Sequence, residues 1–190
     1  MQNMEVIVAA FGRNSDVLKR STEVILPDVQ KAAEILLGVV QTDKTMFACG
    51  NGGSAADAAH LVGEWLCRYK NDRRPLRAIA LVSELAAITA IANDYSYEEI
   101  FARQLKALGS AGDALVAITT SGKSLNVIAA IEEARRKKLK VIVLTGKNGA
   151  SLRDRADVVV VIPTDETARI QEMHKIILHA MCEFVDANLI

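Results

Sequence analysis

Five short apolar runs, separated by amphipathic segments, constrain the fold of this chain more than any other feature of its sequence. The runs lie at residues 45–49, 77–81, 114–119, 140–145 and 158–162. Their apolarity is continuous rather than alternating, which is typical of strands covered on both faces of a parallel sheet. The amphipathic segments between them supply the helical crossovers that parallel strands need. We therefore predict an α/β fold, a doubly wound three-layer αβα sandwich with a five-stranded parallel sheet.

Both ends of the chain have helical periodicity. Apolar residues recur at helical spacing from Val6 to Val39, and Pro27 is suited to the first turn of a second helix, so extra N-terminal helices are expected. A last helix is expected at residues 167–187, apolar on more than one side, as in helices buried under a sheet or between subunits. We divide the chain into a helical arm at 1–42 and a domain at 43–190, which together form one structural unit.

Composition limits the classes of function. The 190 residues include 23 Lys and Arg and 23 Asp and Glu, so no net positive field favours general nucleic-acid or membrane binding. Cys49, Cys67 and Cys182 are odd in number and form no CxxC pair, which fits reduced thiols. The N-terminus lacks a basic leader before an apolar stretch, and no apolar run is long enough to span a bilayer. We predict a soluble, cytoplasmic protein.

The first predicted strand runs into a glycine-rich turn at residues 50–53, and a helix follows. The turn matches the dinucleotide fingerprint GxGxx[GA], but the second strand ends too late and on apolar residues, where the fingerprint needs an acidic one. On the helix, His60 and Glu64 are four residues apart and share a face, with Arg68 one turn further along. This pair suits either metal binding or proton transfer.

The third predicted strand ends in a hydroxyl-rich segment, ThrThrSerGlyLysSer at 119–124. Its four hydroxyls open a helix whose N-terminal amides favour anions, so we expect a phosphate cradle rather than an ordinary helix cap. A nucleotide-binding Walker A motif is excluded because it needs glycine at position 117, which is Ala117.

The last helix carries two of the three histidines, His174 and His179, together with Arg169 and Gln171. Gln171 and His179 are eight residues apart, roughly 12 Å along a straight helix. Both can reach one metal ion only if two subunits contribute or the helix bends; otherwise one of them lies outside the coordination sphere. His174 alone reads as a polar residue in a helix contact.

These motifs together resemble the phosphoheptose isomerases of the sugar-isomerase (SIS) superfamily. The resemblance rests on CysGlyAsnGlyGlySer at 49–54, the HisxxxGlu helix, AlaAsnAsp at 92–94, the hydroxyl-rich segment, LeuThrGlyLys at 144–147 and ArgIleGlnGluMetHis at 169–174, and it extends over nearly the whole chain in order. It implies the SIS fold and an aldose-ketose isomerase that converts sedoheptulose 7-phosphate to D-glycero-D-manno-heptose 7-phosphate. It further implies a homotetramer with active sites between subunits, and a role in heptose precursors of lipopolysaccharide.

The resemblance also implies the roles of individual residues. Glu64 and His179 are the proton-transfer pair. One Zn²⁺ per subunit is associated with His60, Glu64, Gln171 and His179. The phosphosugar is held by a larger set: Asn51, Gly52, Gly53, Ser54, Glu64, Arg68, Asn93, Asp94, Thr119, Thr120, Ser121, Ser124 and Gln171. Lys123 stands where the family often has Asn, and a lysine there changes the charge of the cradle.

Ketose-aldose isomerisation needs a base near the carbon and an acid near the carbonyl oxygen, and Glu64 and His179 fit these roles through an enediol. Three other functions remain open at this point. The same fold has members that bind the bacterial replication initiator without catalysis, but in them the positions of Glu64 and His179 tend to be replaced. A phosphosugar sensor, or an isomerase of another ketose phosphate, would keep the same pocket.

Overall fold

The computed structural model describes residues 2–189 and contains one sheet of five parallel strands. They are β1 (Met46–Gly50), β2 (Ala78–Ala80), β3 (Ala114–Thr119), β4 (Lys140–Gly146) and β5 (Val158–Ile162). Their spatial order is β2-β1-β3-β4-β5, and every pairing is parallel. The predicted α/β class and all five predicted strands are confirmed.

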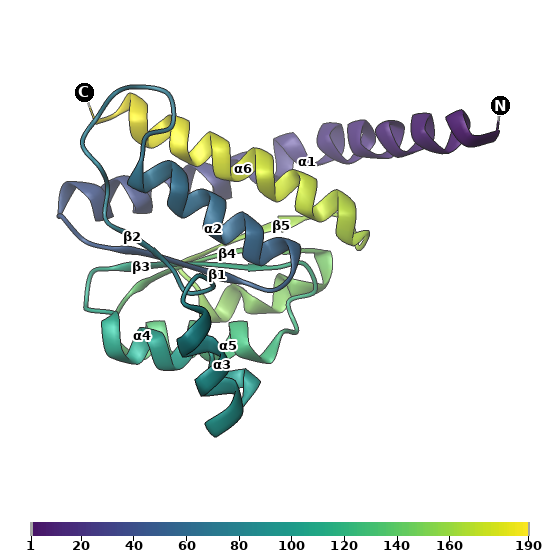
Figure 1. Cartoon of the computed structure of the whole chain (residues 1–190). Helices are drawn as coiled ribbons and strands as arrows, with labels where there is room; N and C mark the ends of the chain where they lie inside the picture. The colour runs from purple at the N-terminus through teal and green to yellow at the C-terminus, as the bar shows by residue number, and fades with distance from the viewer. Residues whose placement is uncertain (1, 190) are drawn as a thin grey trace.

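Helices cover both faces of this sheet, as the prediction of three layers requires (Figure 1). On one face lie α1 (Gln2–Gln41), α2 (Gly53–Leu66) and α6 (Thr167–Ala187). On the other lie α3 (Leu85–Asp94), α4 (Ala102–Leu108) and α5 (Leu125–Arg136), with two short 3₁₀ helices at Tyr97–Glu99 and Lys147–Arg155. The last helix has the predicted bounds.

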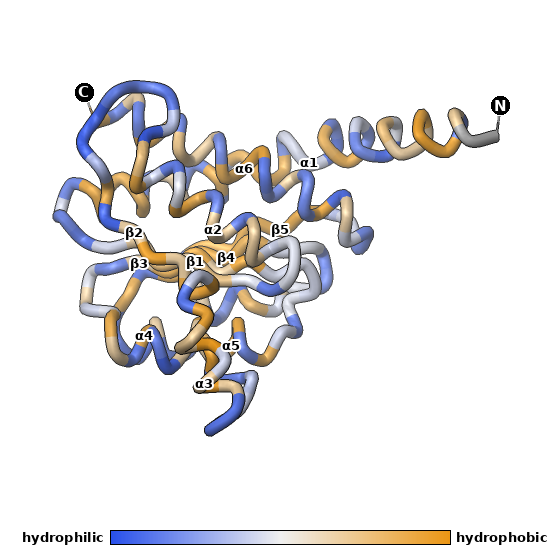
Figure 2. Tube along the Cα trace, viewed as in Figure 1, coloured by the Kyte–Doolittle hydropathy of each residue, from blue (hydrophilic) through white to orange (hydrophobic). Residues whose placement is uncertain are grey.

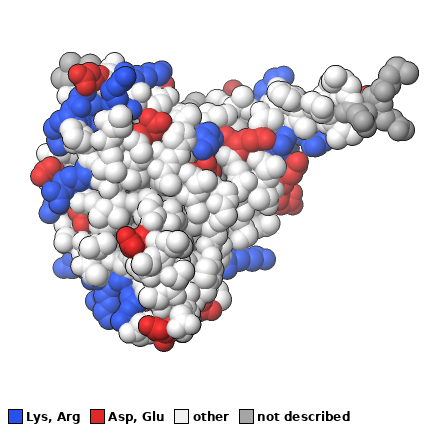
Figure 3. Space-filling model, viewed as in Figure 1, with Lys and Arg blue, Asp and Glu red and all other residues white. Residues whose placement is uncertain are grey.

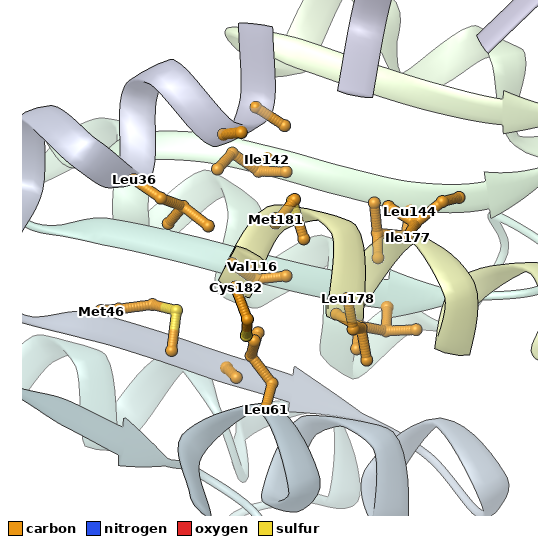
Figure 4. Packing of buried hydrophobic residues seen from close by; sticks show 14 of the residues in the cluster. Leu36, Met46, Leu61, Val116, Ile142, Leu144, Ile177, Leu178, Met181 and Cys182 are labelled. Carbon is orange, nitrogen blue, oxygen red and sulfur yellow. The ribbon is translucent and has the colours of Figure 1, made fainter. Parts of the chain in front are cut away.

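Strand side chains alternate between two separate apolar cores. Met46 and Ala48 of β1 face α1, α2 and α6, whereas Phe47 and Cys49 face the opposite layer. Apolar residues therefore gather along the sheet and on the inner sides of the helices (Figure 2). In the first core, residues of α2 and α6 such as Leu61 and Met181 pack over the strands (Figure 4). Continuous apolarity along each strand reflects this burial on both faces.

The expectation that Pro27 begins a second helix is wrong, because α1 is one helix with Pro27 inside it. Proline has no N–H, so the carbonyl of Glu23 loses its helical partner at this turn. Glu23 and Pro27 are both exposed, and water can bond that carbonyl. Ile25 and Val29, on either side of the proline, are buried in the first core and hold the helix in place.

The N-terminal half of α1 extends away from the rest of the molecule (Figure 1). Val6, Val8 and Phe11 on this half are 69%, 62% and 76% exposed. The same half is tied to α6 where Asn14 donates to Glu172 and Arg169 donates to the carbonyl of Ala10. This part of the chain presents apolar side chains that no described residue covers.

The strand order places a topological switch between β1 and β3. The chain leaves β1 toward β2 on one side and returns to β3 on the other, and in such sheets ligands bind beyond the carboxyl ends of the strands at the switch point. Lys and Arg side chains are interspersed with Asp and Glu over the visible face, in line with the balanced charge (Figure 3). Within residues 2–189, no helix is both long and apolar enough to cross a membrane.

Candidate active site

The glycine-rich turn after β1 brings backbone and side chains close to α6. Gly52 has a φ of 55°, a left-handed conformation that favours glycine. A Cβ on Gly53 would lie 2.5 Å from Nε2 of Gln171, so the amide of Gln171 rests directly against the turn. Ser54 is buried at the start of α2. The turn thus joins the end of β1 to the helix that carries the predicted metal and acid-base residues.

Asn51 ties the two sides of the switch point together. Its Nδ2 donates to Oδ1 of Asn126 at 2.9 Å, and Nδ2 of Asn126 donates back to Oδ1 of Asn51 at 2.8 Å. The hydroxyl of Tyr97 also donates to Oδ1 of Asn51, at 3.0 Å. Asn126 and Tyr97 were not predicted as site residues. These bonds fix the loop after β1 against the start of α5.

The hydroxyl-rich segment after β3 forms a tight loop in front of α5. The amide of Gly122 donates to Oγ1 of Thr119, and the amide of Lys123 donates to Oγ of Ser121. No side chain caps α5, although Ser124 occupies the N-cap position. Hydroxyls that are not used for capping, beside a helix N-terminus, fit an anion better than an ordinary cap. Ser121 and Lys123 are exposed there, and Thr120 and Ser124 are half-buried.

Glu64, His60 and His179 converge within this one chain. Nε2 of His60 lies 2.9 Å from Oε1 of Glu64, and one ligand atom from each of the three residues lies within 4.8 Å of the others. The rings of His60 and His179 meet edge to face, with centroids 5.2 Å apart, and the ring of Tyr69 lies 5.6 Å from that of His179. All three residues are half-buried, so a ligand can reach them.

Two imidazoles and a carboxylate form a donor set that suits a divalent metal ion with a free coordination position. The cluster needs no second subunit and no bend in α6 to bring His179 to the residues of α2. Gln171 lies two turns before His179 on α6, and its amide rests against the glycine turn. The site therefore offers a metal ion one ligand atom from each of the three cluster residues, and it places the amide of Gln171 beside the loop that follows β1.

A lysine that the sequence analysis missed lies next to the cluster. Nζ of Lys175 is 2.6 Å from Oδ1 of Asp57 and 3.0 Å from Nδ1 of His60. Gln171, Lys175 and His179 follow one another at intervals of four residues, so they share the face of α6 that meets α2. That spacing was visible in the sequence, but nothing in it indicated the partner helix.

Asp57, Gln171 and Lys175 also line a hollow between α2 and α6. It has a volume of about 390 Å³ and is bounded by Gly53, Asp57, Gln171, Glu172 and Lys175. A larger hollow of about 670 Å³ runs beside β2 and has a mostly apolar lining. Neither hollow is lined by His60, Glu64 or His179, but the smaller one contains Gly53 of the glycine turn and the Asp57 and Lys175 pair beside His60, so we locate the site there by its chemistry.

Arg68 does not lie where its spacing predicted. The helix α2 ends at Leu66, and Cys67 leaves the helical conformation with a ψ of −95°. Arg68 therefore lies in an exposed loop, where its guanidinium donates to the carbonyl of Lys70. The prediction that it continues the face of His60 and Glu64 is wrong, because the helix stops before it.

Two further predicted residues, Asn93 and Asp94, lie apart from the cluster, and so does His174, which was expected only to make a helix contact. Asn93 and Asp94 are exposed at the end of α3, in the opposite helical layer, and bond to each other at 2.9 Å. His174 is fully buried, and burial lowers the pKa of its imidazole to about 4, against the opposing charge of Asp57. A neutral, enclosed histidine of this kind belongs to the packing of α6 rather than to the cluster.

An internal ion pair holds α2 and α6 together behind the cluster. Nε of Arg73 lies 2.6 Å from Oδ1 of Asp186, with side chains only 9% and 3% exposed. Arg73 also donates to the backbone carbonyls of Glu64 and Trp65. Burial raises the pKa of Asp186, but the bonds from Arg73 and the amide of Lys70 outweigh it and lower the pKa below its ordinary value.

Comparison with known proteins agrees with this geometry. A family model for the SIS domain matches residues 11–146. A phosphoheptose isomerase of Shewanella denitrificans is 44% identical over 189 residues, which are 98% of this chain and 96% of that protein. The structure of phosphoheptose isomerase GmhA from Neisseria gonorrhoeae superposes with a TM-score of 0.91 and 39% identity, covering 97% of this chain and 98% of that one. A phosphoheptose isomerase structure from Francisella tularensis gives 0.95 and 35%, covering 99% and 100%.

Proposed function

The chain belongs to the phosphoheptose isomerases of the SIS-domain family, and from that premise we propose how its residues isomerise sedoheptulose 7-phosphate. It is an aldose-ketose isomerase, and its product is D-glycero-D-manno-heptose 7-phosphate. The observation that carries the mechanism is the meeting of Glu64 with His179 beside His60. A carboxylate and an imidazole at one point are what proton transfer between adjacent carbons requires.

In the proposed reaction, Glu64 takes a proton from C1 of the ketose while the N–H of His179 donates to the carbonyl oxygen at C2. The C1–H electron pair forms the double bond of an enediol, and the oxygen at C2 gains the proton. Glu64 then returns its proton to C2, and the hydroxyl of C1 gives its proton back to the ring nitrogen of His179 as the aldehyde forms, so both residues return to their starting states. No oxidant or reductant is consumed.

The substrate phosphate is proposed to lie in the loop of Thr119, Thr120, Ser121 and Ser124, at the N-terminus of α5. The absence of a side-chain cap on α5 and the position of the loop at the switch point support this proposal. Gly52 and Gly53 let the backbone approach the sugar, and Asn51 orients that turn. Binding the distant phosphate holds C1 and C2 in register with the acid-base pair.

We further propose that the divalent ion at this cluster is Zn²⁺, held by His60, Glu64 and His179 with Gln171 nearby. The two imidazoles and one carboxylate support this choice, since zinc prefers nitrogen and carboxylate ligands. When bound, the ion supplies positive charge that polarises the sugar carbonyl. Glu64 and His179 orient and move the protons.

Assembly and location are part of the same proposal. We expect a homotetramer in the cytoplasm, with the arm at 1–42 packing between copies of the domain at 43–190. The exposed apolar side chains of Val6, Val8 and Phe11 support this, because monomers rarely leave such a stripe uncovered. Asn93 and Asp94, exposed and apart from the cluster, and Arg68 are proposed to reach a sugar across a subunit contact.

The test is turnover of sedoheptulose 7-phosphate by the purified chain, with the aldose product identified next to six- and five-carbon ketose phosphates. Glu64→Gln is expected to reduce kcat by roughly 10³-fold while phosphosugar binding persists. Glu183→Gln is the matched control, because Glu183 pairs with Lys70 at an exposed position of α6. Near-normal turnover by Glu64→Gln would remove the proposed base.

Non-catalytic binding of the replication initiator is not favoured. Glu64 and His179 are both present and lie together, and the relatives described above are named as isomerases. Capture of initiator protein without turnover would reverse this ranking, and tight phosphosugar binding without product would indicate a sensor.

A further inference from the structure

Lys175 occupies the junction between the candidate metal cluster and a buried carboxylate. Its Nζ contacts Oδ1 of Asp57 at 2.6 Å and Nδ1 of His60 at 3.0 Å. Asp57 is 5% exposed, whereas the side chain of Lys175 is 40% exposed. The lysine therefore reaches in from the surface and bridges the imidazole and the buried carboxylate.

The hydrogen bonds around His60 run in one direction. A lysine ammonium has three donors and no acceptor, so Nδ1 of His60 must accept from it. A neutral imidazole that accepts at Nδ1 carries its proton on Nε2. Nε2 faces Oε1 of Glu64 at 2.9 Å and donates to it. Lys175 thus selects the tautomer of His60 that is bonded to Glu64.

That tautomer is the wrong one for holding a metal ion at the cluster. The nitrogen on the side of Glu64 is Nε2, and it can bind a cation only with its lone pair free. The ring proton then belongs on Nδ1, where it would face the lysine ammonium, donor against donor. Metal-binding histidines instead donate their second N–H to a carboxylate or carbonyl. Asp57 is such a carboxylate, but it pairs with Lys175, which itself contacts Nδ1 of the ring.

We propose that Lys175 weakens metal binding at the His60, Glu64 and His179 cluster by holding His60 as a donor to Glu64. Metal entry requires Lys175 to swing aside, after which Asp57 can accept from Nδ1 of His60. The positive charge of the lysine opposes a second cation in the same direction. This inference rests on the proposed function, because it concerns the same cluster.

The experiment measures Zn²⁺ affinity of the full-length, metal-stripped protein by competition with a chromophoric chelator. Lys175→Met removes the donor and the charge, and we expect it to bind Zn²⁺ about tenfold more tightly than the wild type. Lys175→Arg keeps both and should stay near the wild-type value. Lys140→Met is the control, because it removes a lysine paired with Asp157 at the opposite end of the sheet and should leave the affinity unchanged.

Two further variants separate the causes. Lys175→Gln is neutral and offers an amide oxygen to Nδ1, so it should match or exceed Lys175→Met, and it serves as the comparison if the Met variant folds poorly. Adding Asp57→Asn to Lys175→Met removes the carboxylate acceptor and should cancel most of the gain.

Equal or weaker Zn²⁺ binding by both Lys175→Met and Lys175→Gln would overturn the proposal, as would an arginine variant that binds as tightly as the methionine one. Turnover of sedoheptulose 7-phosphate by the wild type, measured on the same preparation, tests the proposed function separately. A protein that turns over the sugar but shows no affinity difference retains the function and loses the role of Lys175. If the variants bind Zn²⁺ more tightly but the wild type does not turn over the sugar, the role of Lys175 is retained and the proposed function is lost.

Discussion

Buried His174 makes the free energy of unfolding depend on pH. The imidazole is fully enclosed on α6, and neither ring nitrogen has a hydrogen-bond partner among residues 2–189. Burial lowers its pKa from the ordinary 6.5 to about 4, because the imidazolium ion would lose its water, and the charge of Asp57 and the nearby backbone of Thr145 only partly oppose this. Folding therefore requires the neutral ring.

The sign of the effect follows from which state binds the proton first. Below pH 6.5 the unfolded chain takes up a proton that the folded protein does not, so acid favours unfolding. The contribution of His174 is complete above that pH and falls as the pH approaches 4. Linkage gives a loss of about 1.4 kcal/mol by pH 5.5 and about 2.6 kcal/mol by pH 4.5.

Urea unfolding at pH 7.5, 5.5 and 4.5 measures this loss, at one protein concentration. His174→Met is the comparison, because methionine has a similar volume, cannot titrate and leaves no unpaired ring nitrogen in the core. Contributions from the carboxylates cancel in the difference between the two proteins. The wild type should lose about 2.6 kcal/mol more than the variant by pH 4.5. Parallel pH profiles for the two proteins would refute the buried neutral imidazole.

Three other perturbations have defined outcomes. Asp186→Asn leaves the Arg73 charge buried without its partner and should cost about 3–5 kcal/mol in urea unfolding, whereas a cost below about 1 kcal/mol would contradict that burial. Gly122→Ala strains a φ of 68° and brings a Cβ against the backbone of Gly149, so inorganic phosphate binding by calorimetry should weaken at least tenfold while the circular dichroism spectrum is unchanged; unchanged affinity would place the phosphate elsewhere. Removing metal with a chelator should reduce turnover of sedoheptulose 7-phosphate, and adding Zn²⁺ should restore it; full activity after removal, with metal content verified, would exclude a role for the ion.

The sheet was predictable because each strand is apolar without interruption. Val158 to Ile162 and Ala114 to Thr119 contain no polar face, and only burial on both sides explains that pattern. The bounds of α6 were equally readable from its periodicity. Pro27 was misread, because the rule that proline begins a helix cannot take account of buried neighbours on the next turns.

The site was predictable where its residues lie close together in sequence. The spacing of His60 and Glu64 alone places them on one helix face. The hydroxyl-rich segment is recognisable because its four hydroxyl residues directly follow a predicted strand. Lys175 was not predictable, because its partners Asp57 and His60 lie more than a hundred residues away in the chain. Arg73 and Asp186 are likewise separated by 113 residues. Such contacts depend on how α2 and α6 pack, which local patterns do not encode.

The most direct test of the account follows deuterium into the aldose product when the reaction is run in D₂O. Glu64 is 24% exposed, so a proton that it holds can exchange with solvent before it returns to the sugar. The account predicts deuterium at C2 of the product made by the wild type, and roughly 10³-fold slower formation of labelled product by Glu64→Gln at the same enzyme concentration. Labelled product from Glu64→Gln at a rate near that of the wild type would contradict it.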